Sequence, residues 1–209
     1  MLGISQNSRS FVNLVGVPLI LYTIYSDLLF PFLVLSILLF ASLEYLSLIT
    51  AFDININKYI FLFSMLSIYL NSLFNVLEML DLLLFYFIIY FIYEVIFHTR
   101  SNSISITFYL FGLFWLSICM SDSLINLRSQ PNGIFFTYLL FVSMWICDTC
   151  AFIFGSKFGK RKVLPRISPN KTWVGCISGF VAVSIMLFIL YNTKYMEGFD
   201  VINMLVFLL

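Results

Sequence analysis

One stretch of the chain, Asp148–Gly175, holds most of the residues that could do chemistry: DTCAFIFGSKFGKRKVLPRISPNKTWVG. It begins inside one apolar run and ends inside the next. Six of the eleven Lys and Arg residues fall between its two ends, namely Lys157, Lys160, Arg161, Lys162, Arg166 and Lys171. Clustered cations neutralise phosphate groups, and a nearby carboxylate can orient a metal ion. The stretch therefore predicts a phosphate-binding loop.

Asp148 is predicted to lie within the membrane part of its helix, seven residues before Gly155 and ~10 Å away along the helix axis. An ionisable residue at that depth is costly and usually faces a bundle interior or an aqueous pocket. Glu44 and Glu94 are predicted at similar depth, so the three carboxylates could line a common cavity. A basic rim on such a cavity suits a Mg²⁺-nucleotide, because Mg²⁺ takes one or two carboxylates plus phosphate oxygens. Alternatively, each carboxylate pairs with a nearby cation or hydroxyl and serves helix packing.

The pair Ser168-Pro169 predicts the start of the helix that follows the loop. Ser168 would be its N-cap and Pro169 its first residue. The free N–H groups of the first turn would then bind an anion, with Lys171 beside it. A cation there works against the helix dipole unless a phosphate lies between them. The alternative is that the loop only sets the orientation of the chain and faces lipid headgroups.

Composition places these residues in a membrane protein. The chain is 62% hydrophobic and 10% charged, whereas soluble domains are about 25% charged. The net charge of +1 implies no nucleic-acid partner. All four cysteines lie in or beside apolar runs, which argues against an extracellular disulfide framework. Cys147 and Cys150 are interpreted as packing residues, because apolar surroundings disfavour the thiolates that redox or metal chemistry needs.

The hydrophobic pattern predicts an all-α fold: one polytopic membrane bundle over residues 1–209, with about seven transmembrane helices and a partial eighth. The expected helices are Phe11–Tyr25, Leu28–Ile49, Tyr59–Leu77, Leu82–Phe97, Ile104–Met120, Ile134–Phe154 and Trp173–Tyr191, and the partial one is Val201–Leu209. The segment 121–132 is expected to be a loop, with a turn signal at Pro131-Asn132-Gly133.

Counting cations gives the expected orientation. Nine Lys and Arg residues lie on the side of the N-terminus and two on the other side. Without the basic loop the balance is three against two, so that loop supplies most of the bias. The N-terminus and the loop are therefore expected to face the cytoplasm, in a bacterial inner (plasma) membrane. Gly175-x-x-x-Gly179 allows a close helix crossing and is compatible with a homodimer, although such motifs are common in membrane helices.

The stretch resembles the phosphatidate cytidylyltransferase family, also called CDP-diacylglycerol synthase. That family has Asp-Thr-x-Ala at a helix end, a glycine-rich basic loop, and Pro-x-Ile-Ser-Pro-x-Lys-Thr-x-Glu-Gly. The matching residues are Asp148, Thr149, Ala151, Gly155, Lys157, Gly159, Lys160, Pro165, Ile167, Ser168, Pro169, Lys171, Thr172 and Gly175. The segment Arg128–Gly133 and the pair Glu44-Tyr45 are also similar to the family.

The resemblance implies a nucleotidyltransferase that makes CDP-diacylglycerol from CTP and phosphatidic acid among membrane lipids, with Mg²⁺ as cofactor. It implies that Asp148 positions metal or nucleotide, and that Ser168 and Lys171 hold a phosphate. The further residues expected to bind CTP or lipid phosphate are Lys157, Lys160, Lys162, Arg166 and Thr172.

Two departures from the family pattern bear on this expectation. Val174 stands where the family usually has Glu. The family's C-terminal signature, whose acidic residues are thought to hold catalytic metals, would follow Leu209, so the chain is expected to be C-terminally truncated. Two alternatives stay open: an inactive remnant of that enzyme, and a small membrane transporter.

Overall fold

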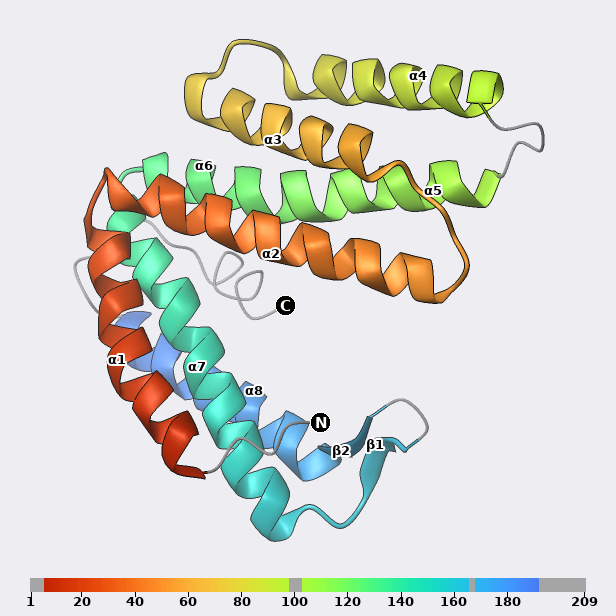
Figure 1. Cartoon of the computed structure of the whole chain (residues 1–209). Coiled ribbons are helices and arrows are strands. Elements are labelled where there is room, and N and C mark those ends of the chain that lie inside the picture. Colours follow the sequence, from red (N-terminus) through yellow and green to blue (C-terminus); the bar gives the residue numbers. More distant parts are fainter. Residues whose placement is uncertain (1–5, 98–102, 166–167, 192–209) are drawn as a thin grey trace. The chain divides into compact units, whose positions relative to one another are not determined.

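A computed structural model describes residues 6–97, 103–165 and 168–191 of the chain. Helices dominate it, and one short hairpin interrupts them (Figure 1). The helices are α1 (Gln6–Tyr25), α2 (Leu29–Ala51), α3 (Lys58–Phe74), α4 (Met79–Phe97), α5 (Ser103–Gly112), the π-helix η1 (Leu113–Asp122), α6 (Ser123–Ser129), α7 (Gly133–Phe158) and α8 (Trp173–Tyr191). The strands are β1 (Lys162–Leu164) and β2 (Ser168–Thr172).

Five helices in the described part of the chain are long and apolar enough to cross a membrane. They are α2, α4, the continuous rod Ile104–Ser129, α7 and α8. The expectation of an integral membrane protein built from helices is confirmed. Among the residues searched, two further apolar helical segments, Gly16–Tyr25 and Lys58–Phe74, are shorter, so the count of seven transmembrane helices stays a prediction. The partial eighth helix, Val201–Leu209, lies outside the described residues.

The predicted loop 121–132 is wrong for most of its length, because the helix continues to Ser129. Hydroxyl groups that resemble a loop signal in the sequence are satisfied within the helix itself. Ser121 donates to the Ser117 carbonyl at 2.7 Å, and Ser129 donates to the Ile125 carbonyl at 2.9 Å. Serine can sit inside a helix when its hydroxyl bonds back to the preceding turn. The remaining turn is short and includes Asn132, whose φ is 59°.

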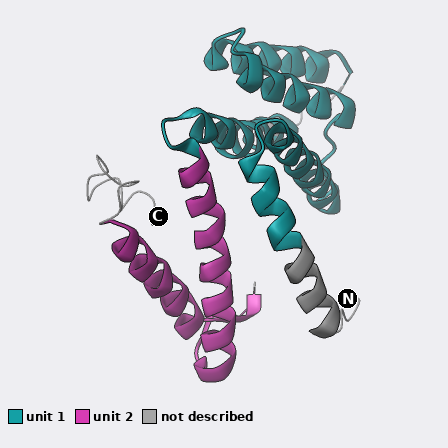
Figure 2. Cartoon of the chain, turned by 90° about the vertical axis from the view of Figure 1, so that its left-hand side faces the viewer, with its two compact units in different colours: residues 1–133 teal, residues 134–209 magenta. Residues whose placement is uncertain are grey.

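The chain divides into two compact units, residues 1–133 and residues 134–209 (Figure 2). In the first unit α3 packs against α2, α4 and η1. Two buried aromatic rings, Tyr90 and Tyr109, stack with centroids 3.8 Å apart. The Tyr109 hydroxyl donates to Ser64 Oγ at 3.1 Å, which gives this buried hydroxyl a hydrogen-bond partner. In the second unit α7 and α8 enclose an apolar cluster of Leu139, Val183 and Leu187.

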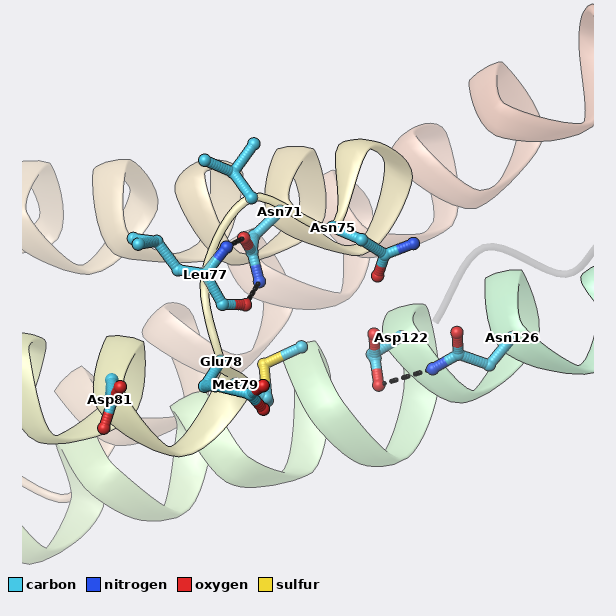
Figure 3. A pocket seen from close by; sticks show the side chains of 9 residues that line it. Asn71, Asn75, Leu77, Glu78, Met79, Asp81, Asp122 and Asn126 are labelled. Atoms are coloured by element: carbon cyan, nitrogen blue, oxygen red, sulfur yellow. Dashed lines mark hydrogen bonds between the residues drawn. The ribbon is translucent and has the colours of Figure 1, made fainter.

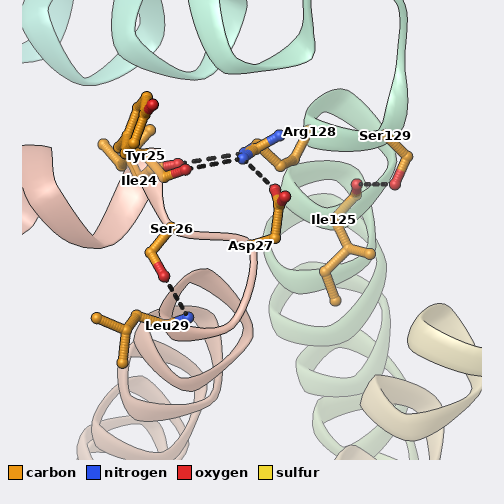
Figure 4. A network of polar contacts seen from close by, with 8 residues as sticks. All are labelled: Ile24, Tyr25, Ser26, Asp27, Leu29, Ile125, Arg128 and Ser129. Carbon is orange, nitrogen blue, oxygen red and sulfur yellow. Dashed lines mark hydrogen bonds and ion pairs between the residues drawn. The ribbon is translucent and has the colours of Figure 1, made fainter.

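Arg128 joins the end of α6 to the end of α1 (Figure 4). Its Nε donates to the Ile24 carbonyl at 3.2 Å, and its Nη2 donates to the Tyr25 carbonyl at 3.4 Å. The same Nη2 lies 2.6 Å from Asp27 Oδ1. Carbonyls at a helix end lack partners within the helix and favour a positive charge. Arg128 therefore caps α1 from a distant part of the chain.

Candidate phosphate-binding site

Asp148 lies on α7, about two helical turns before Gly155, and its side chain is exposed. Its carboxylate makes no hydrogen bond or ion pair with any described residue. No partner among the described residues therefore holds this carboxylate in place. Glu44, also exposed, and Glu94, which is only 1% exposed, lie in the first unit. A cavity shared by the three carboxylates stays a prediction.

The C-terminal end of α7 and the start of α8 meet at a crossing built from glycines. A Cβ added to Gly155 would lie 3.0 Å from Thr172 Oγ1 and 3.2 Å from the Gly175 Cα. One added to Gly175 would lie 2.8 Å from the Ala151 carbonyl oxygen. Each is tight enough that a neighbouring atom would have to shift. Glycine is needed here because the two backbones approach more closely than side chains allow.

Gly179 extends the same crossing one turn further. A Cβ there would lie 2.9 Å from Cys147 Sγ and 3.0 Å from the Cys147 carbonyl oxygen. Gly175 and Gly179 thus both face α7 within one chain. Cys147 belongs to the packing around the α7–α8 cluster, which agrees with its interpretation as a packing residue. Ser178 adds a polar link, since its hydroxyl lies 3.2 Å from the Cys150 carbonyl oxygen.

Between the two helices the chain forms an antiparallel hairpin. Lys162 pairs with Thr172 and Leu164 pairs with Ser168, with an irregular register between the two pairs. The backbone N–H of Trp173 donates to the Arg161 carbonyl at 3.1 Å, which ties the base of the hairpin to the first residue of α8. The basic segment is therefore a structured hairpin at the helix crossing.

The predicted helix start at Ser168 and Pro169 is wrong, because α8 begins at Trp173. Residues 168–172 are extended because they pair with β1, and a proline suits a short edge strand as well as a helix start. Thr172 takes the N-cap position: its Oγ1 accepts a hydrogen bond from Gly175 N–H at 3.2 Å. A threonine directly before an apolar run is an N-cap signal that sequence reasoning could have used. Lys171 consequently lies in β2, outside the first turn of α8.

The exposed cations of the hairpin and of the end of α7 form one charged group. They are Lys157, Lys160, Arg161, Lys162 and Lys171. None of these five forms an ion pair with a carboxylate in the described part of the chain. Arg166 lies outside the described residues. Unpaired cations on one short segment create a positive potential that attracts phosphate groups.

Two other predicted site residues, Ser168 and Thr172, differ in their burial and in their contacts. Ser168 is partly buried at the end of β2 that pairs with Leu164. Thr172 is only 4% exposed, and its hydroxyl both caps α8 and lies 3.4 Å from the Gly155 carbonyl oxygen. Thr172 thus brings the glycines of α7 and α8 together. Its contact with a nucleotide, and that of Ser168 with a phosphate, stay predictions.

The residues that could act as metal ligands determine whether the predicted Mg²⁺ can bind at Asp148. No group of three or more His, Cys, Asp or Glu residues that could hold a metal ion is found in the described segments. A single unpaired carboxylate fits a Mg²⁺ ion that takes its other ligands from phosphate oxygens and water. It does not make a metal site of its own.

Comparison with known proteins identifies the family of the chain. The model of the cytidylyltransferase family matches residues 7–209. A phosphatidate cytidylyltransferase of Haemophilus influenzae is 38% identical over 58 residues, which are 28% of this chain and 20% of that protein. The enzyme of the same name from Rickettsia bellii is 38% identical over 82 residues, which are 39% of this chain and 35% of that protein.

A third relative, the phosphatidate cytidylyltransferase of Staphylococcus saprophyticus, is 36% identical over 70 residues, which are 31% of this chain and 27% of that protein. The matched segments thus span about a fifth to a third of the curated relatives. No solved structure matches the chain significantly. Because the family model covers nearly the whole sequence, the chain belongs to the cytidylyltransferase family.

Proposed function

We propose that the protein is a CTP:phosphatidate cytidylyltransferase. In this reaction a phosphate oxygen of phosphatidate attacks the α-phosphorus of CTP. The bond from that phosphorus to the β-phosphate oxygen breaks, and pyrophosphate leaves as CDP-diacylglycerol forms. The observation that carries the proposal is the group of five unpaired cations held at a glycine-built helix crossing. The names of the matching relatives support the choice of substrates.

The chain's residues would act mainly by binding and charge neutralisation, as in phosphoryl transfer generally. Lys157, Lys160 and Lys162 would bind the phosphates of CTP or of the lipid, and Arg166 and Thr172 are assigned with them. Ser168 and Lys171 would hold one phosphate group beside the start of α8. The antiparallel pairing supports the assignment of the strand residues, because it pairs Lys162 with Thr172 and places Ser168 and Lys171 on the same strand.

Asp148 would position the nucleotide directly or through Mg²⁺. When bound, Mg²⁺ would offset the negative charge of the triphosphate. Asp148 is exposed and has no partner in the described segments, so it is available for either role. Asp148→Asn should weaken Mg²⁺-dependent nucleotide binding, and an unchanged Mg²⁺ titration would make this aspartate structural.

We also propose that residues 1–209 form one integral-membrane domain. Its N-terminus and basic hairpin would face the cytoplasm, in a bacterial inner membrane. The excess of cations on that side supports the orientation. A homodimer stays a proposal, and Gly175 and Gly179 do not supply its interface as they stand, since both contact α7.

The decisive experiment follows label from CTP into lipid. Purified protein is incubated with α-labelled CTP, phosphatidate and Mg²⁺, and labelled CDP-diacylglycerol is separated from CTP. Lys171→Ala should abolish CTP or phosphatidate binding. Lys58→Ala is the matched control, because Lys58 is an exposed cation on α3, outside the hairpin. Equal binding by Lys171→Ala and wild type would remove Lys171 from the site.

The same preparation separates the two alternatives. An inactive remnant would fold and form no labelled lipid. A transporter would move labelled substrate into proteoliposomes without forming CDP-diacylglycerol. Family membership favours the transferase over the transporter.

A further inference from the structure

An apolar groove runs along one face of the helix pair α3–α4 in the first unit. One hollow, of about 510 Å³, lies between Tyr59, Phe63 and Phe85. A second, of about 370 Å³, continues from Phe63 toward Leu70 and Phe74 at the end of α3. Phe63 lines both hollows, so they form one groove along α3. Its apolar lining suits a hydrocarbon chain.

This groove opens into a polar pocket at the turn between α3 and α4. The pocket has a volume of about 530 Å³ and shares Asn71, Val76 and Leu77 with the second hollow (Figure 3). The amide of Asn71 accepts from Leu77 N–H at 2.9 Å and donates to the Leu77 carbonyl at 3.0 Å. Since both bonds cross the turn, they hold in place the point at which the groove meets the pocket.

Three carboxylates line the pocket, and they come from two elements. Glu78 and Asp81 lie at the start of α4, whereas Asp122 ends η1. Asp122 accepts a hydrogen bond from Asn126 at 2.9 Å. The side chains of Glu78 and Asp81 have no hydrogen bond or ion pair with other described residues. The described lining contains no Lys, Arg or His, so the pocket carries an uncompensated negative charge.

The ligand that fits must therefore join a hydrocarbon chain to a positive head. A bare divalent metal does not fit, since no three His, Cys, Asp or Glu residues in the described segments are placed to hold one. An anionic lipid such as phosphatidate is disfavoured by the carboxylates. A primary ammonium group can donate up to three hydrogen bonds to carboxylate and amide oxygens. The pocket includes the turn between α3 and α4, and the ends of membrane-spanning helices lie near the level at which lipid headgroups meet water.

We propose that this groove and pocket bind a membrane lipid with a primary ammonium headgroup. The ammonium lies among Glu78, Asp81 and Asp122, and an acyl chain lies along the α3–α4 groove past Phe63. The site belongs to the first unit and the cationic hairpin to the second, and the proposal does not depend on the proposed transferase activity. Its chemistry, an ammonium-bearing amphiphile, is opposite in charge to phosphatidate.

The test is lipid retention by the full chain, measured by native mass spectrometry from non-ionic detergent. Phosphatidylethanolamine and phosphatidylglycerol with identical acyl chains are added at equal concentration. Phosphatidylethanolamine has an ammonium group that can form charged hydrogen bonds with the carboxylates, and phosphatidylglycerol has none. We therefore expect about tenfold more phosphatidylethanolamine bound than phosphatidylglycerol. The double variant E78Q/D122N should lose this preference. Asp53→Asn, at the opposite end of α3, is the matched control and should keep it.

Two further arms test the groove. Ser67 lines the second hollow, so Ser67→Trp should fill it and reduce retention of phosphatidylethanolamine. Glycerophosphoethanolamine, which has the headgroup without chains, should not displace the lipid from wild-type protein, and this arm needs no variant. Equal retention of the two lipids, an unchanged preference in E78Q/D122N, or displacement by the chain-free headgroup would each overturn the proposal.

Discussion

The hydroxyl of Thr172 accepts a hydrogen bond from the backbone N–H of Gly175 at 3.2 Å, so one buried side chain caps α8 at the point where it crosses α7. The same oxygen lies 3.4 Å from the Gly155 carbonyl oxygen on α7. The basic hairpin ends at Thr172, and the helix begins at the next residue. The position of the cationic group relative to both helices therefore depends on this contact.

Replacing Thr172 by Val should destabilise the protein, because Val keeps the shape of Thr and removes the hydroxyl. Loss of an N-cap costs about 0.5–2 kcal/mol. Thermal unfolding in detergent should show a lower midpoint for Thr172→Val. Thr172→Ser retains the capping oxygen and should stay close to wild type. Equal losses in the two variants would mean that the methyl packing of Thr172, and not its cap, holds the crossing.

Gly159→Ala should disturb the start of the hairpin. A Cβ at Gly159 would clash with the Gly155 carbonyl oxygen and with Oγ1 of Thr172, both of which belong to the helix crossing. Forcing extra volume into a packed site typically costs about 1–3 kcal/mol. CTP binding and thermal unfolding should both weaken. Gly16→Ala is the control, since nothing lies within 4 Å of a Cβ added there. An unaffected Gly159→Ala variant would contradict the tight approach.

Arg128→Ala should destabilise the first unit more than Asp27→Asn does. Arg128 donates to the carbonyls of Ile24 and Tyr25 at the end of α1, whereas the Asp27 side chain is 91% exposed. Exposed ion pairs contribute little, about 0–1 kcal/mol. Hydrogen bonds from a charged donor are worth about 1.5–3 kcal/mol. Chemical unfolding of the two variants measures the difference, and equal losses would assign the stabilisation to the ion pair.

Tyr45→Phe should lower stability while leaving the fold intact. The Tyr45 hydroxyl donates to the Phe108 carbonyl at 2.7 Å and so links α2 to α5. Hydrogen bonds between membrane helices average about 0.6 kcal/mol, and rarely exceed 2. The comparison is Tyr22→Phe, whose ring is 65% exposed. A larger loss from Tyr22→Phe than from Tyr45→Phe would rule out a role for this interhelical bond.

Several features could be predicted from the sequence because they depend on composition and local pattern. Apolar runs of the right length predict helices in a membrane, and Trp173–Tyr191 matches α8 residue for residue. The cluster of Lys and Arg residues between Lys157 and Lys171 can be identified from the sequence alone. The motif residues were sufficient to indicate the family. These properties hold whatever the chain's tertiary contacts are.

Other features depended on contacts between residues far apart in sequence. Ser168 and Pro169 carry a local helix-start signal, but pairing of their strand with Lys162–Leu164 keeps them extended. Thr172 is the N-cap of the helix instead. Arg128 resembles an ordinary loop cation until its contacts with Ile24 and Tyr25 are known. Gly175 and Gly179 could have faced any partner, and the fold places them against α7. Local pattern thus determined the class of protein and its charged segment. Backbone pairing and close packing, which no short window of sequence contains, decided where the described residues of the predicted site lie.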